Sequence, residues 1–325
     1  MEARGPPAGG RLGVAHSAQA PAREAAAGLG ARGTRDRSGV RPYPGAVSDL
    51  MQDAPSRSEV EEAVQALSRD GIVGRKGAFL PGWADRMRED IEVAYADART
   101  RERGAVGRGP ARWYVAIHPE QLRGFVDLVS HPWLVAVCEA VLGPDYEVVE
   151  LGFDIPFAGA KDQPWHRDFA SPPETYRDRE LTSLAFNLTA VDTTADMGPF
   201  EVAVGTQYER GEDFLHGMFP PRSGFPRYAS LGVKKMPERG DMSARSALTI
   251  HRGTANLSEL ARPVLILGVD APGASPEGLH DMTITREFHD SLPSEVRRHV
   301  AARVVDELEP IVQSHLIEGL VMGED

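Results

Sequence analysis

Residues 247–269 read Ala-Leu-Thr-Ile-His-Arg-Gly-Thr-Ala-Asn-Leu-Ser-Glu-Leu-Ala-Arg-Pro-Val-Leu-Ile-Leu-Gly-Val. Two short apolar runs flank a connection rich in Gly, Asn and Ser, which is typical of two β-strands joined by a loop. His251 follows the first run, and Arg262 stands eleven residues later, at the start of the second. A hairpin of this length would place the two strands side by side, so we expect Arg262 to lie near His251.

Short apolar runs of this kind recur throughout the second half of the chain. They are separated by Gly, Pro, Asp and Asn, and they predict strands at 147–153, 181–188, 200–204, 247–250 and 264–269. Upstream the apolar residues have helical spacing instead. We expect helices at 56–67, 83–98 and 118–129, short strands at 71–73 and 78–80, and a closing helix at 293–317.

Helices followed by many short strands predict a mainly β fold with flanking α. The expected core is a double-stranded β-helix, also called a jelly roll or cupin-like fold, with the N-terminal helices packed on one outer face. A chain of 325 residues is long enough for one large domain, and we assign residues 46–325 to it. Residues 1–45 are rich in Gly, Ala, Arg and Pro without an apolar period, so we expect a disordered tail.

Composition narrows the choice of partners. The net charge of −12 disfavours nucleic acid and anionic membrane surfaces, because both select basic faces. No apolar stretch reaches the ~20 residues of a membrane helix, and no signal-peptide pattern opens the sequence. The single cysteine, Cys138, allows no internal disulfide and no cysteine-rich zinc site, and its apolar neighbours predict a buried side chain. We expect a cytoplasmic enzyme that acts on a small molecule.

The segment Gln163-Pro-Trp-His-Arg-Asp168 places His166 two residues before Asp168, after a predicted strand. In extended backbone, residues two apart point to the same face, so both side chains can reach one metal ion. Chance gives about one such pair in a chain of this composition, so the pair needs support from elsewhere. A second pair, His118 and Glu120, flanks a proline where a helix should begin, and we interpret it as helix punctuation.

That support comes from His251 and Arg262. Two histidines and one carboxylate on one face of a metal leave positions that suit iron(II) and oxygen. A nearby arginine can bind the far carboxylate of a dicarboxylate co-substrate through two parallel charge-assisted hydrogen bonds. The remaining histidines lack a partner at ligand spacing, and we interpret them as surface or capping residues: His131, His216, His280, His289, His299 and His315.

The chain here resembles the phytanoyl-CoA dioxygenase family of iron(II)/2-oxoglutarate oxygenases, which also includes ectoine hydroxylases. The matching segments are Trp-His-Arg-Asp (165–168), Met-Gly-Pro-Phe-Glu-Val-Ala-Val-Gly-Thr (197–206) and His-Arg-Gly-Thr-Ala-Asn (251–256) through 263. The resemblance covers about residues 56–269 and implies iron(II), 2-oxoglutarate and oxygen as cofactor and co-substrates. It implies His166, Asp168 and His251 as iron ligands and Arg262 as the 2-oxoglutarate anchor.

Weaker matches extend the implied site. Gln163 matches a position that often touches the co-substrate, and Thr254 and Asn256 lie in the matching turn. A further family contact to the co-substrate carboxylate falls near Arg112 or Trp113, where no motif fixes the register.

One segment departs from the pattern of the family that the chain resembles, and one residue that matches it bears on the reaction. Where the family usually has Pro-Gly-Ser-His, residues 204–207 read Val-Gly-Thr-Gln, which affects the hydrogen bonds of that turn and no ligand. Relatives that halogenate carry a small residue at the position of Asp168, so we expect hydroxylation or another oxidative outcome. Trp165 is left open between a wall of the site and a packing residue at a strand end.

The resemblance implies hydroxylation of an unactivated C–H bond of a small molecule, with release of succinate and carbon dioxide. Acyl-CoA, an amino or imino acid and a secondary metabolite all remain open as substrates. One alternative is a jelly-roll metalloenzyme that does not use 2-oxoglutarate. Formation of succinate would distinguish the 2-oxoglutarate-dependent enzyme from it. Another alternative is a non-catalytic jelly-roll binding protein. Metal analysis of the purified protein would distinguish it from a metalloenzyme.

The segment 206–246 shows little strand pattern and is long for a hairpin connection. Such segments are usually lids or binding loops, so we expect a substrate loop that is mobile until substrate orders it over the iron. Between Arg222 and Arg239 it carries five basic side chains against one acid, Glu238. These charges would draw in an anionic substrate, or they would merely balance the acids at 209–213.

Overall fold

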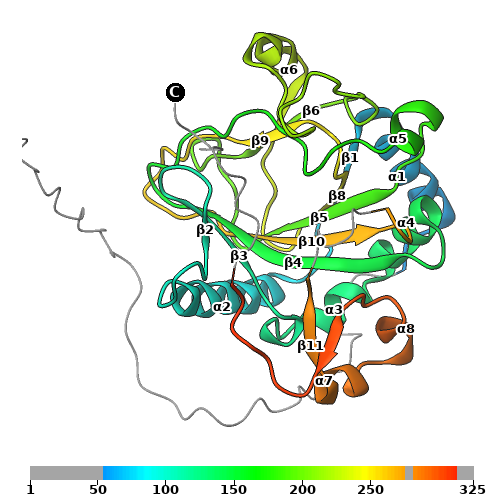
Figure 1. Cartoon of the computed structure of the whole chain (residues 1–325), viewed down its shortest axis with the longest axis vertical. Coiled ribbons are helices and arrows are strands. Elements are labelled where there is room, and N and C mark those ends of the chain that lie inside the picture. The colour runs from blue at the N-terminus through cyan, green and yellow to red at the C-terminus, as the bar shows by residue number, and fades with distance from the viewer. Residues whose placement is uncertain (1–53, 275–280, 313–325) are drawn as a thin grey trace, which may run out of the picture. The chain divides into compact units, whose positions relative to one another are not determined.

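Most of the strands expected in the second half of the chain assemble into one large sheet (Figure 1). The structure is a computed structural model that describes residues 54–274 and 281–312. The strand order is β1-β8-β5-β10-β4-β3-β2, and all neighbours are antiparallel. The strands are β1 (Ile72–Arg75), β2 (Val106–Gly107), β3 (Arg112–Ala116), β4 (Glu147–Pro156), β5 (Ser183–Thr189), β8 (Met242–Ser246) and β10 (Val264–Asp270).

The two faces of this sheet have different environments, because successive side chains of a strand point to opposite sides. In the central strand β10, Leu265 and Leu267 are fully buried in the main apolar core. Ile266 and Gly268, which alternate with them, line a cavity on the other face. One face of the sheet therefore builds the core, and the other is available for a site.

Helices cover the core face, and three of them supply most of the apolar side chains that helices contribute to the core: α1 (Arg57–Asp70), α2 (Pro81–Ala98) and α4 (Pro132–Leu142). α1 begins with a capping box, in which Ser56 and Glu59 each accept a hydrogen bond from the other's backbone N–H. It ends at Gly71, whose φ of 76° favours glycine. Figure 1 shows α2 and α3 (Phe125–Val129) on one side of the sheet and β6 (Phe200–Ala203) and β9 (His251–Gly253) on the other.

A smaller sheet faces the large one across the cavity. It has the order β7-β6-β9 and comprises β6 (Phe200–Ala203), β7 (Gly232–Lys235) and β9 (His251–Gly253). Phe200, Val233 and His251, one from each strand, line the cavity. Two antiparallel sheets that enclose a site form the jelly-roll core, so the predicted fold class is confirmed.

Shorter elements complete the described chain: α3 (Phe125–Val129), α5 (Pro173–Asp178), α6 (Phe225–Leu231), α7 (Arg286–Ser291), α8 (Ser294–Arg297), β11 (Thr283–Thr285) and β12 (Arg303–Val305), with 3-10 turns at Pro119–Gln121 and Arg222–Gly224. β11 and β12 form a parallel pair. His118 precedes the first 3-10 turn, and its ring contacts the carbonyl oxygens of Thr283 and Glu309. Within residues 54–274 and 281–312, none of the helices combines the length and the apolar character that a membrane span requires.

The predicted strand at 247–250 and the predicted hairpin were wrong. β8 ends at Ser246, and residues 247–250 form a tight turn in which the Ser246 hydroxyl accepts from Leu248 N at 3.2 Å. β9 pairs with β6 in the small sheet, whereas β10 has β4 and β5 on its two edges. The connection from His251 to Arg262 therefore crosses from one sheet to the other.

Other boundaries also differ from the predictions. The helix expected at 118–129 is interrupted, because Leu122 is extended and α3 starts only after Gly124. At 78–80 only Phe79 pairs, through a bond from its N–H to Gly240 O at 2.9 Å. The closing helix is limited to α8, and the chain then turns into β12. The predicted tail at 1–45 and residues 313–317 of that helix lie outside the described ranges.

The segment 206–246 contains more regular structure than its sequence pattern indicates. It includes α6, β7 and β8, and β8 lies between β1 and β5 in the large sheet. The pattern is hidden because β8 alternates Met242, Ala244 and Ser246 with Ser243 and Arg245, so neither face reads as apolar. The last part of this segment, β8, is therefore a strand of the large sheet.

Candidate metal centre

His166 and His251 are brought together by a short stretch of antiparallel backbone pairing. His166 N donates to His251 O at 2.9 Å, and His251 N donates to His166 O at 2.8 Å. The pairing continues where Gln163 N donates to Gly253 O at 2.9 Å. Residues directly opposite each other in such a pairing have neighbouring side chains, and the two imidazole centroids lie 4.4 Å apart.

Backbone carbonyls determine which nitrogen of each ring is available to a metal. Nδ1 of His166 lies 2.9 Å from Pro164 O, and Nδ1 of His251 lies 2.9 Å from Thr249 O. Because a carbonyl oxygen can only accept, each Nδ1 carries the hydrogen and each Nε2 keeps its lone pair. Burial lowers the pKa of His166 to about 4 and holds the pKa of His251 well below its ordinary value. Both rings are therefore neutral ligands at neutral pH.

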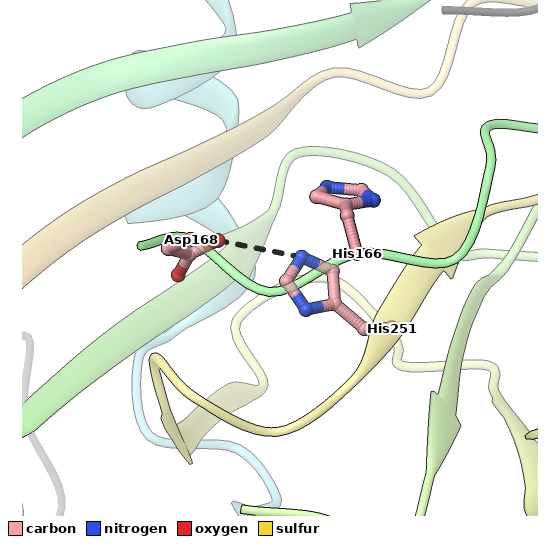
Figure 2. A group of neighbouring side chains, drawn as sticks. All are labelled: His166, Asp168 and His251. Carbon is pink, nitrogen blue, oxygen red and sulfur yellow. Dashed lines mark ion pairs between the residues drawn. The ribbon is translucent and has the colours of Figure 1, made fainter. Parts of the chain in front are cut away.

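Asp168 completes the group from the same extended segment as His166 (Figure 2). Its Oδ1 lies 3.5 Å from Nε2 of His251, and one ligand atom from each of the three residues lies within 4.8 Å of the other two. Its Oδ2 accepts from Nη1 of Arg245 at 2.8 Å. Burial raises the pKa of Asp168, but Arg245 and the two imidazoles outweigh burial and bring the pKa to about 2. The site therefore offers two imidazoles and one carboxylate.

The three side chains line a cavity of about 1260 Å³ between the two sheets. Its floor is the inner face of the large sheet, which contributes Tyr114 and Glu150. Met218 and Phe219, from the segment before β8, also line the cavity, and the Phe219 ring stacks on His166 with centroids 5.7 Å apart. A cavity of this size accommodates a co-substrate together with a small-molecule substrate.

Arg262 enters the same cavity directly before β10 and is 3% exposed. Its Nε donates to Gly198 O at 3.0 Å. Across the ranges that the structure covers, no residue accepts a hydrogen bond from its two terminal nitrogens. Burial lowers the pKa of Arg262 to about 10, so the side chain remains a cation at neutral pH. Its fork is thus available to an anionic ligand.

A second buried arginine, Arg112 of β3, lines the cavity, but its terminal nitrogens are occupied. They donate to Asp154 Oδ2 at 2.9 Å and to Thr254 O at 3.1 Å. Gly253 makes room for this guanidinium, since a Cβ there would lie 2.1 Å from Nη1. Of the two positions that the sequence analysis named for the co-substrate carboxylate, Arg112 therefore lies in the cavity. Trp113 packs under Arg99 instead, with the Arg99 Cζ 3.8 Å from the ring centroid.

The three weaker site residues have different surroundings. Gln163 lines the cavity, and its Oε1 accepts from Gly253 N at 2.9 Å. Thr254 Oγ1 and Asn256 Nδ2 both donate to backbone carbonyls, with shortest distances of 2.7 Å each. Thr254 and Asn256 therefore brace the connection that leads to Arg262.

The polar side chains of the turn at 204–207, where the chain departs from the family, make local hydrogen bonds. Thr206 Oγ1 accepts from Ile250 N at 2.9 Å, at the end of the turn that precedes His251. Gln207 Nε2 donates to Ser68 O at 2.8 Å and so ties the turn to the end of α1. Neither residue reaches the metal group.

Trp165 is 1% exposed and packs against Tyr228 with ring centroids 6.2 Å apart, so it is a packing residue. His131 caps α4 by accepting from Trp133 N, but it is buried, as is His299. The prediction of a surface or capping residue is therefore confirmed for His131 and wrong for His299. His216 lines the cavity, His289 pairs with Asp290, and His280 and His315 lie outside the described residues.

Arg245 is the site residue that the sequence did not reveal. It is buried at 3% exposed and contacts Asp168 from β8. The only sequence feature that could have indicated it is that Ser243 and Arg245 are two apart and would share one face of a strand. The strand was predicted at 247–250, after both residues, so this feature was not recognised. The contact with Asp168 depends on long-range strand pairing, which no local spacing encodes.

Comparison with known proteins gives an independent view of the fold and family. The sequence model of one family, described as phytanoyl-CoA dioxygenase (PhyH), matches residues 67–264. Curated proteins gave no match. Among solved structures, EctD from S. alaskensis, with 2-oxoglutarate and 5-hydroxyectoine, is similar at a TM-score of 0.56 and 15% identity, over 81% of this chain and 94% of that chain.

Two further structures have the same fold. AviO1 from Streptomyces viridochromogenes Tue57 has a TM-score of 0.51 and 16% identity, over 68% of this chain and 99% of that chain. SnoK, a non-heme alpha ketoglutarate dependent carbocyclase from nogalamycin biosynthesis, has a TM-score of 0.51 and 19% identity, over 70% of this chain and 87% of that chain. The family match covers more than half of the chain and contains the metal group and Arg262. The chain belongs to the phytanoyl-CoA dioxygenase family of iron(II)- and 2-oxoglutarate-dependent oxygenases.

Proposed function

We propose that this enzyme hydroxylates a C–H bond of a small-molecule substrate, with iron(II) held by His166, Asp168 and His251 and 2-oxoglutarate held by Arg262. The observation that carries the proposal is the convergence of three ligand atoms within 4.8 Å in a cavity that also contains Arg262. When bound, the iron and 2-oxoglutarate would supply the oxidising chemistry, with release of succinate and carbon dioxide. The protein would supply binding, orientation and exclusion of water.

The chemistry of the donor set fits iron(II). Each imidazole presents an unprotonated Nε2 because a carbonyl occupies its Nδ1. The carboxylate of Asp168 supplies a negative charge, and one of its oxygens is already occupied by Arg245. Two neutral nitrogens and one carboxylate oxygen leave further positions on an octahedral metal for co-substrate and oxygen. A closed structural site would instead fill every position with protein ligands.

Arg262 is the better candidate for the 2-oxoglutarate carboxylate of the two buried arginines. Its terminal nitrogens have no acceptor in the described chain, whereas those of Arg112 donate to Asp154 and Thr254. We propose that Gln163 contacts the co-substrate beside Arg262. Thr254 and Asn256 would act indirectly, by fixing the connection between His251 and Arg262.

The part of the 206–246 segment that precedes β8 would form the substrate side of the site. Met218, Phe219 and Lys235 line the cavity from this segment. Arg167 anchors its first part through bonds to the carbonyls of Glu209, Arg210 and Gly217. We therefore propose a substrate loop that is fixed at its start and closes over the metal from its later part.

Iron content and co-substrate turnover test the proposal. Purified wild-type protein should bind one equivalent of iron(II) and form succinate from 2-oxoglutarate in a reaction that needs oxygen and is stimulated by the correct substrate. His166→Ala and Asp168→Ala should lose iron and turnover together. His289→Ala changes a histidine on α7, outside the cavity lining, and serves as the matched control.

Three outcomes would count against the function. Full activity after metal removal by a chelator would exclude the iron site. Substrate oxidation without succinate would favour the metalloenzyme that does not use 2-oxoglutarate. Absence of metal from the wild-type protein would favour a binding protein.

A further inference from the structure

A tyrosine and a glutamate on the floor of the cavity form a pair that the proposed metal site does not use. Tyr114 of β3 and Glu150 of β4 both line the cavity, and the Tyr114 hydroxyl donates a hydrogen bond to Glu150 Oε1. Burial and the charge of Glu150 hold the pKa of Tyr114 well above its ordinary value. The phenol therefore stays protonated, and Glu150 is the acceptor.

Two glycines in neighbouring strands make room for this pair. A Cβ at Gly152 would lie 2.4 Å from the Tyr114 hydroxyl, and a Cβ at Gly268 would lie 2.8 Å from the Glu150 Cβ. Neither glycine has a positive φ, so the backbone does not require glycine at these positions. Glycine inside a strand weakens the strand and marks a close approach. Here the Tyr114 side chain lies close to Gly152, and the Glu150 side chain lies close to Gly268.

Glu150 has different partners from two other carboxylates that line the cavity. Asp154 accepts from Arg112 at 2.9 Å, and Asp168 accepts from Arg245 at 2.8 Å. Glu150 accepts only from the phenol, and in the portion of the chain that is described no cation pairs with it and nothing donates to its Oε2. A partly buried carboxylate is stabilised by a positively charged partner.

The pair and the metal group belong to the same cavity, so one substrate can contact both. Tyr114 and Glu150 line this cavity together with His166, Asp168 and His251. Arg108 also lines it and lies over the Tyr114 ring, with its Cζ 4.2 Å from the ring centroid.

We propose that Glu150, positioned by Tyr114, binds a positively charged amine nitrogen of the substrate. An ammonium group matches the free Oε2 in charge and donates the hydrogen bond that Oε2 lacks. The proposal rests on the proposed function, because it assigns the substrate of that same cavity. It favours amine-bearing substrates, such as amino or imino acids, over acyl-CoA.

Three probes with the same ring and different head groups test the assignment: cyclohexylammonium, cyclohexanol and cyclohexanecarboxylate. Each is titrated into the full chain loaded with Mn(II) and 2-oxoglutarate, and the paramagnetic relaxation of its ring protons is compared with that in the Zn(II)-loaded protein. Wild type should bind the ammonium probe saturably near Mn(II), and the alcohol at least about tenfold more weakly. The carboxylate probe should bind more weakly than the ammonium probe.

The variants separate Glu150 from the general charge of the cavity. Glu150→Gln should weaken binding of the ammonium probe by about tenfold or more and leave the alcohol unchanged. Tyr114→Phe should weaken it by a few-fold, because the carboxylate remains but is less well positioned. Glu309→Gln removes the same charge from an exposed position on the same cavity and should leave the affinity unchanged. Circular dichroism verifies that each variant is folded.

Equal affinity for the three probes, no saturable binding of the ammonium probe, or an unchanged affinity in Glu150→Gln would each overturn the assignment. The Mn(II) affinity is measured separately for every variant. If wild type does not bind Mn(II), the proposed function fails, while the same titration of metal-free protein, followed by the line widths of the probe, still tests Glu150.

Discussion

Arg245 and Asp168 form an ion pair at the edge of the candidate metal site, with Nη1 2.8 Å from Oδ2. The Asp168 oxygen that Arg245 occupies is not the one that faces His251. Asp168 therefore offers one oxygen, Oδ1, to a metal ion. A carboxylate that binds through one oxygen leaves one more coordination position than a carboxylate that binds through two.

Arg245→Met should make the fold depend more strongly on the metal. Without Arg245, the half-buried Asp168 has no cation partner in the metal-free protein, so the free energy of unfolding should fall by about 2 kcal/mol. Mn(II) would supply the missing charge and should stabilise the variant by more than it stabilises wild type. Urea denaturation with and without Mn(II) measures how much the metal raises the free energy of unfolding of wild type and of the variant. Arg239→Met, which breaks exposed ion pairs, is the control, and equal increments would contradict a role of the pair in metal binding.

Arg262→Lys should raise the concentration of 2-oxoglutarate needed for turnover by about a hundredfold, or 2–3 kcal/mol. Lysine keeps the charge but cannot form two parallel bonds to a carboxylate, and it loses the bond that Arg262 Nε makes to Gly198 O. Succinate formation as a function of 2-oxoglutarate concentration is the measurement, with Mn(II) affinity as the control that should not change. An unchanged 2-oxoglutarate dependence would assign Arg262 another task.

Mild acid should destabilise the fold through His131. Burial lowers the pKa of His131 to about 4 from its ordinary value of 6.5. The unfolded chain then binds a proton between pH 6.5 and pH 4 that the folded chain does not bind. The stability contributed by the neutral ring is therefore complete above pH 6.5 and is lost as the pH falls to 4, by about 3 kcal/mol in all.

His131→Asn tests this pH dependence, because asparagine can still cap α4 but does not titrate. At pH 7.5 the variant should lose about 1 kcal/mol with the hydrogen bond from Nε2 to Ala78 O. Between pH 6.5 and 4 its free energy of unfolding should fall less steeply than that of wild type. If both slopes agree, His131 does not carry the effect. His289→Asn, on α7, provides the control.

Filling the site should protect the substrate loop from proteolysis. Trypsin can cleave after Arg222, Arg227 and Lys234, which lie between Gly211 and Gly240. If the later part of the loop closes over the metal, cleavage there should slow severalfold with Mn(II), 2-oxoglutarate and a bound amine probe present together. Time courses resolved by mass spectrometry measure the rates. Equal rates with and without these ligands would leave the loop without a gating role.

The members of the metal group could be predicted because two short patterns, one for each half of the site, can be read from the sequence. His166 and Asp168 are two apart on extended backbone, and the interval from His251 to Arg262 could be read directly from the sequence. The route by which they meet was not predictable in the same way. His251 lies in the small sheet and Arg262 enters the large one, so the expected hairpin was replaced by a crossing between sheets.

The contacts missed by the sequence depend on register between distant strands. Arg245 reaches Asp168 because β8 pairs with β5, and Tyr114 reaches Glu150 because β3 pairs with β4 over Gly152. A shift of one residue in either pairing would turn these side chains to the opposite face. Local patterns identified which residues were chemically competent, but long-range pairing determined which of them became neighbours.

The pairing of β1 with β8 has a consequence for how the protein is made. Ile72 lies opposite Arg245, although most of the described chain separates them in sequence. Such long-range pairs form slowly, because a large loop must close before the contact contributes any stability. On the ribosome, the strand that carries Arg245 would emerge long after β1, whose edge would remain unpaired in the meantime. Expression at lower temperature or with chaperones should therefore raise the yield of folded enzyme more than it does for a helical protein of the same length.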